Sequence, residues 1–256
     1  MATTSAPPPL QQQPAAPHEQ AKIGAMGRVI GVLTSPKETF ADIARAPSWL
    51  VPLLLCAALG VVFAYVMNER VDWYTFVRQQ IERSPRAASM SQEQIAQAAR
   101  MQAQWSPPFA YAIGVCAPFV MALLMGLVYW GAFNAFAGIG ARFKQALAVT
   151  SHALLTGVVS APIVIVIMLL KQRGDVDPEN MMASSAASVL GSDAPRWLVS
   201  LAGSFELFWF WTMFLMAVGF AAINRKKLTT GKAFGIVMGV WLVWVMIKVG
   251  ATYMFS

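Results

Sequence analysis

The chain has 256 residues, of which 57% are hydrophobic and only 12% are charged, and its net charge is +7. Soluble domains carry roughly 25% charged residues, so most of this protein's surface cannot face water. The apolar residues fall in separate blocks of about 20, a length that crosses the hydrocarbon layer as one helix. One large soluble core is thereby excluded. The basic residues lie in short stretches between these blocks, which argues against a nucleic-acid partner.

The first 22 residues are rich in Pro, Ala and Gln. They contain too little apolar surface to offset the entropy lost on ordering. They also lack the basic start and short apolar core of a secretory signal. We therefore expect residues 1–22 to form a disordered tail in front of a membrane domain over residues 23–256.

A short helix is predicted to begin at Ser35, with Pro36 at its first position and Glu38 returning a hydrogen bond to the cap. Apolar residues share one face and two basic residues flank it: Phe40, Ile43, Ala44, Lys37 and Arg45. This pattern is typical of an amphipathic helix at a membrane surface, with the basic groups on lipid phosphates. It equally fits an ordinary capped helix packed on the rest of the protein.

Five blocks are long and apolar enough to cross a bilayer. They cover residues of about 49–67, 109–137, 146–170, 197–223 and 233–255. The second and third contain Pro118 and Pro162, whose freed backbone groups need partners on neighbouring helices. The fold class predicted is all-α, a polytopic membrane helix bundle of about five transmembrane helices with short amphipathic flanking helices.

The polar connection over residues 68–108 predicts a helical hairpin outside the membrane. Helical periodicity runs over residues 71–83, a turn follows at Ser84-Pro85, and Ser91 opens a second helical run. We expect Pro107-Pro108 to close this second run before the next span begins.

Lys and Arg set the expected orientation. Two short loops carry basic residues and no acid, and we expect them to contact lipid head groups: Arg142, Lys144, Arg225, Lys226, Lys227 and Lys232. The segment before the first span is also basic. An odd number of spans puts these three segments on one side, which should be cytoplasmic, with the C-terminus extracytoplasmic.

Two stretches carry a family resemblance. The run GVLTSPKETFADIARAPSWLVPLLL resembles the opening of the Yip-domain membrane family, a P-x-x-x-F helix followed by a first span. The run SFELFWFWTMFLMAVGFAAINRKKLTTGKAFGIV is similar to that family's last two spans and their basic loop. The resemblance implies five spans and a cytoplasmic N-terminus, with residues 68–108 as an insertion. The eukaryotic branch works in vesicle traffic with small GTPases. This chain looks bacterial, so we expect a bacterial cytoplasmic membrane and do not carry that role over.

Two ionisable residues, Glu206 and Lys248, lie within predicted spans. An intramembrane charge costs a few kcal/mol, so a functional site is the default hypothesis. Both residues fall at a similar depth on consecutive helices, where they can meet as an ion pair. The pair is either an ion- or proton-coupled site or, as the favoured interpretation, a structural bridge. In the latter case Lys248 can also extend outward to the interface.

The third span carries a polar stripe of His152, Thr156 and Ser160, spaced four residues apart. Such side chains can bond across to another helix, and a proton relay is the alternative. No second ligand accompanies His152, so a metal site is not expected. Cys56 and Cys116 lie at different depths and are not expected to form a disulfide.

The last span begins with Gly231, Gly235 and Gly239, which form two overlapping G-x-x-x-G units. This spacing lets another backbone approach closely. Close packing within the bundle is the favoured interpretation, and a homodimer interface is the alternative.

No nucleophile–base set and no phosphate-cradling loop stands out, so neither an enzyme nor a cofactor is predicted. We expect a non-catalytic membrane scaffold or accessory protein that acts through the lipid bilayer and through a protein partner or a second copy. The alternative is a small transporter or channel that uses Glu206, Lys248 and the polar stripe.

Overall fold

The computed structural model describes residues 22–176, 178, 185–190 and 194–254, so the predicted tail lies almost entirely outside the described residues. The described chain is built from helices. Its α-helices are α1 (Ala25–Thr34), α2 (Pro36–Arg45), α3 (Leu50–Arg70), α4 (Trp73–Glu82), α5 (Gln92–Ala137), α6 (Phe143–Ala153), α7 (Thr156–Leu170), α8 (Arg196–Ala202), α9 (Leu207–Ile223) and α10 (Thr230–Met254), with short 3-10 helices η1 (Pro85–Ser89) and η2 (Ala186–Val189).

Among the described helices, four segments are long and apolar enough to cross a membrane: α3, α5, α6 with α7, and α10. Helix α9 is equally apolar but has 17 residues, the lower end of the length that crosses the hydrocarbon layer. The predicted all-α membrane bundle is confirmed.

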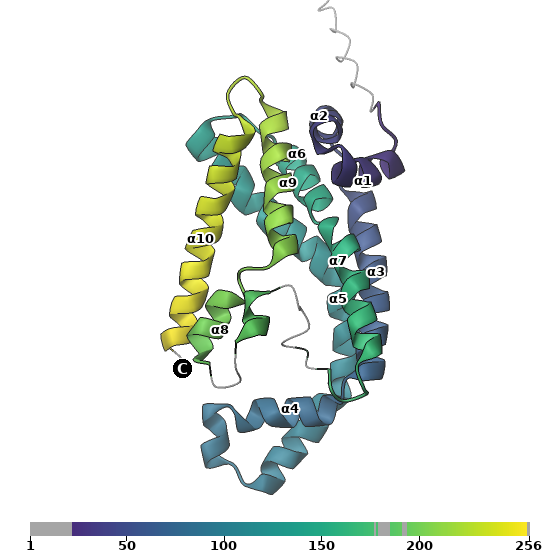
Figure 1. Ribbon diagram of the computed structural model, residues 1–256, viewed down its shortest axis with the longest axis vertical. Coiled ribbons are helices and arrows are strands. Elements are labelled where there is room, and N and C mark those ends of the chain that lie inside the picture. Colours follow the sequence, from purple (N-terminus) through teal and green to yellow (C-terminus); the bar gives the residue numbers. More distant parts are fainter. Residues whose placement is uncertain (1–21, 177, 179–184, 191–193, 255–256) are drawn as a thin grey trace, which may run out of the picture.

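Figure 1 shows these helices standing together, with α1 and α2 lying across one end and α4 beyond the other. We call these the basic end and the hairpin end. Contacts between distant segments hold the basic end together. Arg225 Nη2 donates to the Lys37 carbonyl at 2.9 Å, and Lys227 Nζ donates to the Gly138 carbonyl at 2.8 Å. The three basic segments of the sequence therefore lie at the same end of the bundle.

Helix α2 begins at Pro36 with Ser35 as its N-cap residue, as predicted, but the Ser35 side chain makes no capping bond. The bond expected from Glu38 is blocked because α1 ends at Thr34 and Ser35 is also its C-cap residue. The Ser35 amide already donates to the Gly31 carbonyl at 2.7 Å, so the amide that Glu38 was expected to reach is occupied. The apolar face of α2 packs on the protein: Phe40 is fully buried, and a Cβ at Gly219 of α9 would lie 3.0 Å from its ring.

Helix α5 differs from the prediction because it runs unbroken for 46 residues through Pro107 and Pro108. Its start does follow the sequence signal, since Ser91 and Gln94 form a reciprocal capping box. Proline has a helical φ, and its cost lies in the hydrogen bond it cannot donate to the carbonyl four residues earlier. Those carbonyls belong to residues 103 and 104 of the polar stretch, where water can solvate them. The hairpin is therefore a continuous extension of a spanning helix.

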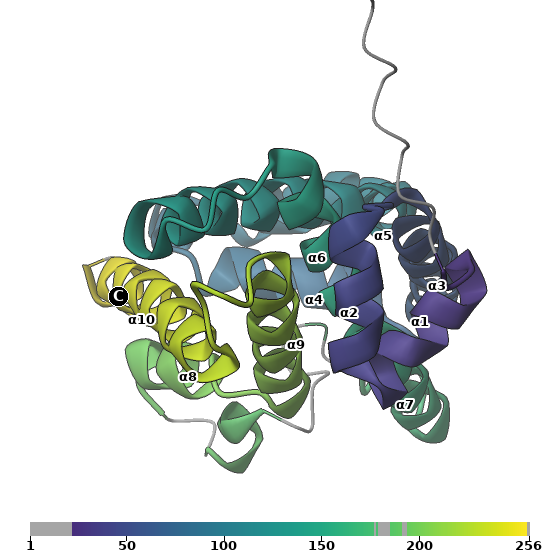
Figure 2. The same ribbon diagram turned by 90° about the horizontal axis from the view of Figure 1, so that it is seen from above.

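Helices α3 and α5 cross at two glycines. A Cβ at Gly114 would lie 2.5 Å from the Gly60 carbonyl oxygen, and a Cβ at Gly60 would meet the Gly114 carbonyl. Seen from the basic end, α3 and α10 lie on opposite sides of the bundle, and α5 runs along the bundle from one to the other (Figure 2). Between them α5 packs on α9, where the Phe133 and Phe220 rings stack with centroids 4.2 Å apart.

Candidate functional site

The predicted span over residues 197–223 is broken. Helix α8 ends at Ala202, α9 begins at Leu207, and four residues between them are not α-helical. The Glu206 carboxylate is the N-cap of α9 and accepts from the Phe208 amide at 3.0 Å and the Trp209 amide at 2.7 Å. A carboxylate is stabilised by the free amides and positive dipole end of a helix N-terminus. The chain therefore breaks where the Glu206 carboxylate can satisfy a new helix start.

Lys248 of α10 faces the other side of this break. Its Nζ donates to the Ser200 carbonyl at 3.0 Å and to the Ser204 hydroxyl at 3.1 Å. The Ser200 carbonyl belongs to the last turn of α8, the negative end of that helix dipole. Thr252 Oγ1 lies 3.3 Å from the Ser200 hydroxyl and extends the polar group. The ammonium is thus held by neutral oxygens of α8 and the break.

Both charges line one cavity of about 520 Å³, together with Ser185, Ser204 and the indoles of Trp209, Trp241 and Trp244. The described hydrogen bonds place the carboxylate on the start of α9 and the ammonium on the end of α8. Direct attraction between Glu206 and Lys248 stays a prediction. The sequence located the two residues, whereas the helix break and the serines that surround Lys248 were not anticipated.

The polar stripe of the third span is buried, but each member has its own partner. Thr156 Oγ1 lies 2.6 Å from Thr212 Oγ1 of α9, a cross-helix hydrogen bond. His152 Nδ1 contacts the Ala148 carbonyl at 2.8 Å, and Ser160 Oγ donates to the Gly157 carbonyl at 3.5 Å. Helix α6 ends at Ala153 before α7 begins, so a break interrupts the stripe. Of these three contacts, the Thr156–Thr212 bond joins two helices, whereas those of His152 and Ser160 stay within α6 and α7.

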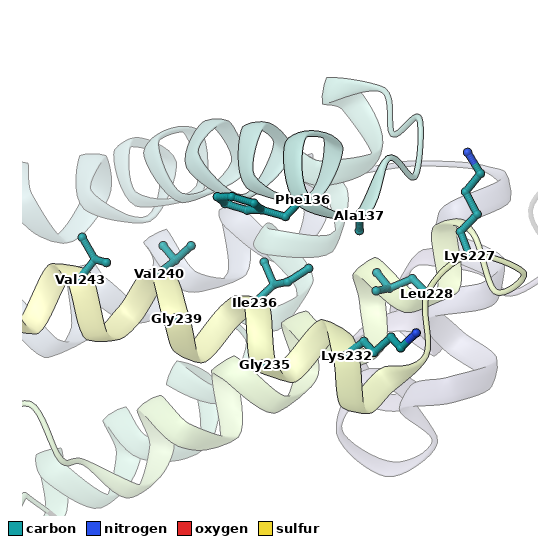
Figure 3. Close-up of a pocket in the computed structure, with 10 residues that line it drawn as sticks. All are labelled: Phe136, Ala137, Lys227, Leu228, Lys232, Gly235, Ile236, Gly239, Val240 and Val243. Carbon is teal, nitrogen blue, oxygen red and sulfur yellow. The ribbon is translucent and has the colours of Figure 1, made fainter.

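The glycines of the last span are placed differently from the favoured interpretation. No atom lies within 4 Å of a Cβ built at Gly231, Gly235 or Gly239. Gly235 and Gly239 instead line an open groove between α5 and α10 (Figure 3). A close approach of two helix backbones occurs instead at the Gly60–Gly114 crossing, and neither glycine belongs to a G-x-x-x-G repeat. The homodimer alternative stays a prediction.

The basic residues assigned to lipid head groups are all exposed: Arg142, Lys144, Arg225, Lys226, Lys227 and Lys232. Two of them also brace the fold through the carbonyl contacts described above. Their position at one end of the bundle is what contact with a lipid surface requires.

A buried ion pair at the basic end was missed in the sequence. The Arg28 guanidinium of α1 donates to Asp42 Oδ2 of α2 through Nε at 2.9 Å and Nη2 at 2.7 Å, with both side chains at most 3% exposed. Arg28 Nη1 reaches the Ala46 carbonyl and the Ser48 hydroxyl, each at 2.8 Å. This clamp fixes α1 and α2 to the start of α3. The sequence did contain a signal for this ion pair, because Arg28 and Asp42 each place a charge on an apolar helix face.

The electrostatics of the clamp favour a charged Asp42. Burial would raise the pKa of this carboxyl, but hydrogen bonds from the Lys22 amide, Arg28 and the Ile23 amide outweigh burial and lower the pKa. The described residues contain no group of three side chains able to hold a metal ion.

Comparison with known proteins assigns the class. The Yip1 domain family matches residues 30–251, almost the whole described chain. This protein therefore belongs to the Yip1 domain family and is a multi-pass membrane protein, which confirms the resemblance read from the sequence. Among individual relatives, the membrane protein YknW of Bacillus subtilis (strain 168) is 27% identical over 191 residues, covering 75% of this chain and 76% of YknW. No solved structure matches.

Proposed function

We propose that this protein is a non-catalytic membrane accessory protein that acts by binding protein or lipid partners. The observation that carries the proposal is polar satisfaction: among the described residues, no buried side-chain nitrogen or oxygen lacks a hydrogen-bond partner. A buried donor or acceptor without a partner would be a candidate contact for a substrate. Here the polar groups inside the bundle bind one another or the backbone, so function is expected on the surfaces.

The hairpin end offers such a surface. Met101 and Trp105 lie on the part of α5 that extends into the hairpin, and they are 61% and 67% exposed. Large exposed aromatic side chains are the usual anchors of protein interfaces. Because α5 is continuous, a partner bound here is coupled rigidly to the bundle.

The test is gentle detergent extraction of the tagged full chain, followed by native mass spectrometry. We expect a stoichiometric protein partner, and we expect Met101→Ser with Trp105→Ser to release it. The matched control is Gln97→Ser with Gln104→Ser, two exposed positions on the same helix. Wild-type protein recovered only as a bare chain would contradict the protein-partner part of the proposal.

Orientation is part of the same proposal: the basic end faces the cytoplasm, as the excess of Lys and Arg requires. Cysteines introduced at Lys144 and Gln97 test it in intact cells with a membrane-impermeant maleimide. Residue 97 should label and residue 144 should not. The reverse pattern would invert the topology.

A small transporter or channel is the second candidate, favoured by the α8–α9 break beside Lys248. Discontinuous helices with charged groups at the break are typical of secondary transporters. Single cysteines at residues 152, 156, 160 and 206 distinguish the two functions. Reaction of all four with aqueous reagents would indicate a water-filled path, and protection at 152, 156 and 160 supports the closed bundle.

A further inference from the structure

A groove of about 800 Å³ opens between the end of α5 and the first half of α10 (Figure 3). Its walls are apolar and include Phe136, Ile236 and Val243, and Gly235 and Gly239 leave it open on the α10 side. Ligand pockets in proteins range from about 300 to 1,000 Å³. The groove is therefore large enough for a ligand, and its walls suit a hydrocarbon.

Charge is confined to one end of the groove. Lys227 and Lys232 line it at the basic end, both are exposed, and no acidic side chain lines the groove. Figure 3 shows Lys232 at the start of α10, Lys227 on the loop before it, and Val243 at the opposite end. The Lys227 ammonium also donates one hydrogen bond to the Gly138 carbonyl at 2.8 Å. The occupant that complements this arrangement has an anionic group at one end and an apolar body.

The length of the groove matches one leaflet. Lys232 and Val243 are eleven residues apart on α10, or about 16 Å at 1.5 Å per residue. Half of the roughly 30 Å hydrocarbon layer is about the same depth. A lipid whose head group lies at the lysines would place its acyl chain along the whole groove.

A second copy of the chain fits less well. Packing α10 against α10 in parallel would bring the Lys227 and Lys232 ammonium groups of two copies together with no acid lining the groove. Like charges brought into an interface oppose association. An anionic lipid instead neutralises them.

We propose that this groove binds one anionic phospholipid from the leaflet at the basic end, with its phosphate at Lys227 and Lys232 and an acyl chain along Gly235 and Gly239. The site deepens the proposed function by naming a lipid partner class. It does not depend on a protein partner, so a failed partner search leaves it standing.

The test uses the full chain in phosphatidylcholine nanodiscs with phosphatidylglycerol as the minor lipid, read by native mass spectrometry after delipidation. Wild type should retain one phosphatidylglycerol. Gly235→Leu and Gly239→Leu fill open space and should lose it, whereas Gly131→Leu on α5, also in open space but outside the groove, should keep it. Lys232→Gln changes an exposed side chain outside the core and should lower the preference for phosphatidylglycerol over phosphatidylcholine about fivefold.

Three results would overturn the proposal. Retention of phosphatidylglycerol by both glycine variants would place the lipid elsewhere. A wild-type dimer that Gly235→Leu converts to monomer without lipid loss would make the groove an interface between copies. Full displacement of the lipid by inorganic phosphate would show that the lysines bind a free anion.

The matched control for Lys232→Gln is Lys226→Gln. Lys226 is a basic-end lysine that does not line the groove, so this change should leave the lipid preference unchanged.

Discussion

Glycines have opposite effects where α5 faces α3 and where it faces α10. Toward α3, Gly60 and Gly114 bring two backbones into contact, and no side chain fits between them. Toward α10, Gly235 and Gly239 are exposed and leave a groove of about 800 Å³. The α3 side is also where α1 and α2 are clamped to the bundle. The difference teaches that a glycine repeat does not identify the packed face of a membrane helix, because packing depends on what lies opposite. Stability should accordingly depend on the α3 side and ligand binding on the α10 side.

The largest expected effect is at the clamp. Arg28→Met leaves Asp42 buried without its main cation and should lower the free energy of unfolding by about 3–5 kcal/mol. Reversible unfolding in mixed detergent micelles measures it. Arg45→Met is the matched control, since this arginine lies 3.4 Å from the same carboxylate but is 39% exposed, and it should change stability by about 1 kcal/mol or less. Equal losses in the two variants would show that the buried contact of Asp42 stabilises the fold no more than the exposed one.

Acid should weaken the same contact. The pKa of Asp42 is lowered from its ordinary 3.8, since hydrogen bonds outweigh burial. The stabilisation is therefore complete above the unfolded pKa and is lost as pH falls through the lowered folded value. Unfolding measured from neutral to acidic pH should show this loss in the wild type. Asp42→Asn should reduce the dependence of stability on pH in this acidic range. If the variant loses as much stability in acid as the wild type, other carboxylates are responsible for the loss.

The glycine crossing should come next. Gly114→Leu forces a side chain against the Gly60 carbonyl, and overpacking of this kind costs typically about 1–3 kcal/mol, more where backbone must move. Gly131→Leu on the same helix has open space around its Cβ and should be nearly neutral. Thermal stability in detergent compares the two, and similar melting points would mean that α3 and α5 do not cross at these glycines.

A smaller effect is expected at the link between α7 and α9. Thr156→Val removes the hydrogen bond to Thr212 and should cost about 0.6–1 kcal/mol, as such bonds do in membranes. A double-mutant cycle with Thr212→Val isolates the pair. The same cycle applied to Glu206→Gln and Lys248→Met tests whether those charges interact. Strictly additive effects would mean that they do not.

Much of the architecture was predictable from sequence alone. The all-α class, the approximate limits of α3 and α10, and the helix start at Ser91 follow from apolar block length and local capping chemistry. The number of predicted membrane crossings between the basic loops places them at the same end of the bundle. These properties depend on residues close in the sequence and on the known thickness of the hydrocarbon layer, so the sequence is enough to predict them.

Tertiary structure decided the rest. The prolines at 107 and 108 allowed either a break or a continuous α5, because their backbone angles suit a helix and only the lost hydrogen bonds had to be tolerated. Glu206 and Lys248 were visible as charges, but the helix start that Glu206 caps exists only because the chain breaks at residues 203–206. The partners of Lys248 lie on α8 and in that break, which are distant from it in the sequence. The Arg28–Asp42 clamp, the glycine crossing and the open groove each depend on which surfaces face each other. Local periodicity does not encode that pairing, so these features required the folded chain.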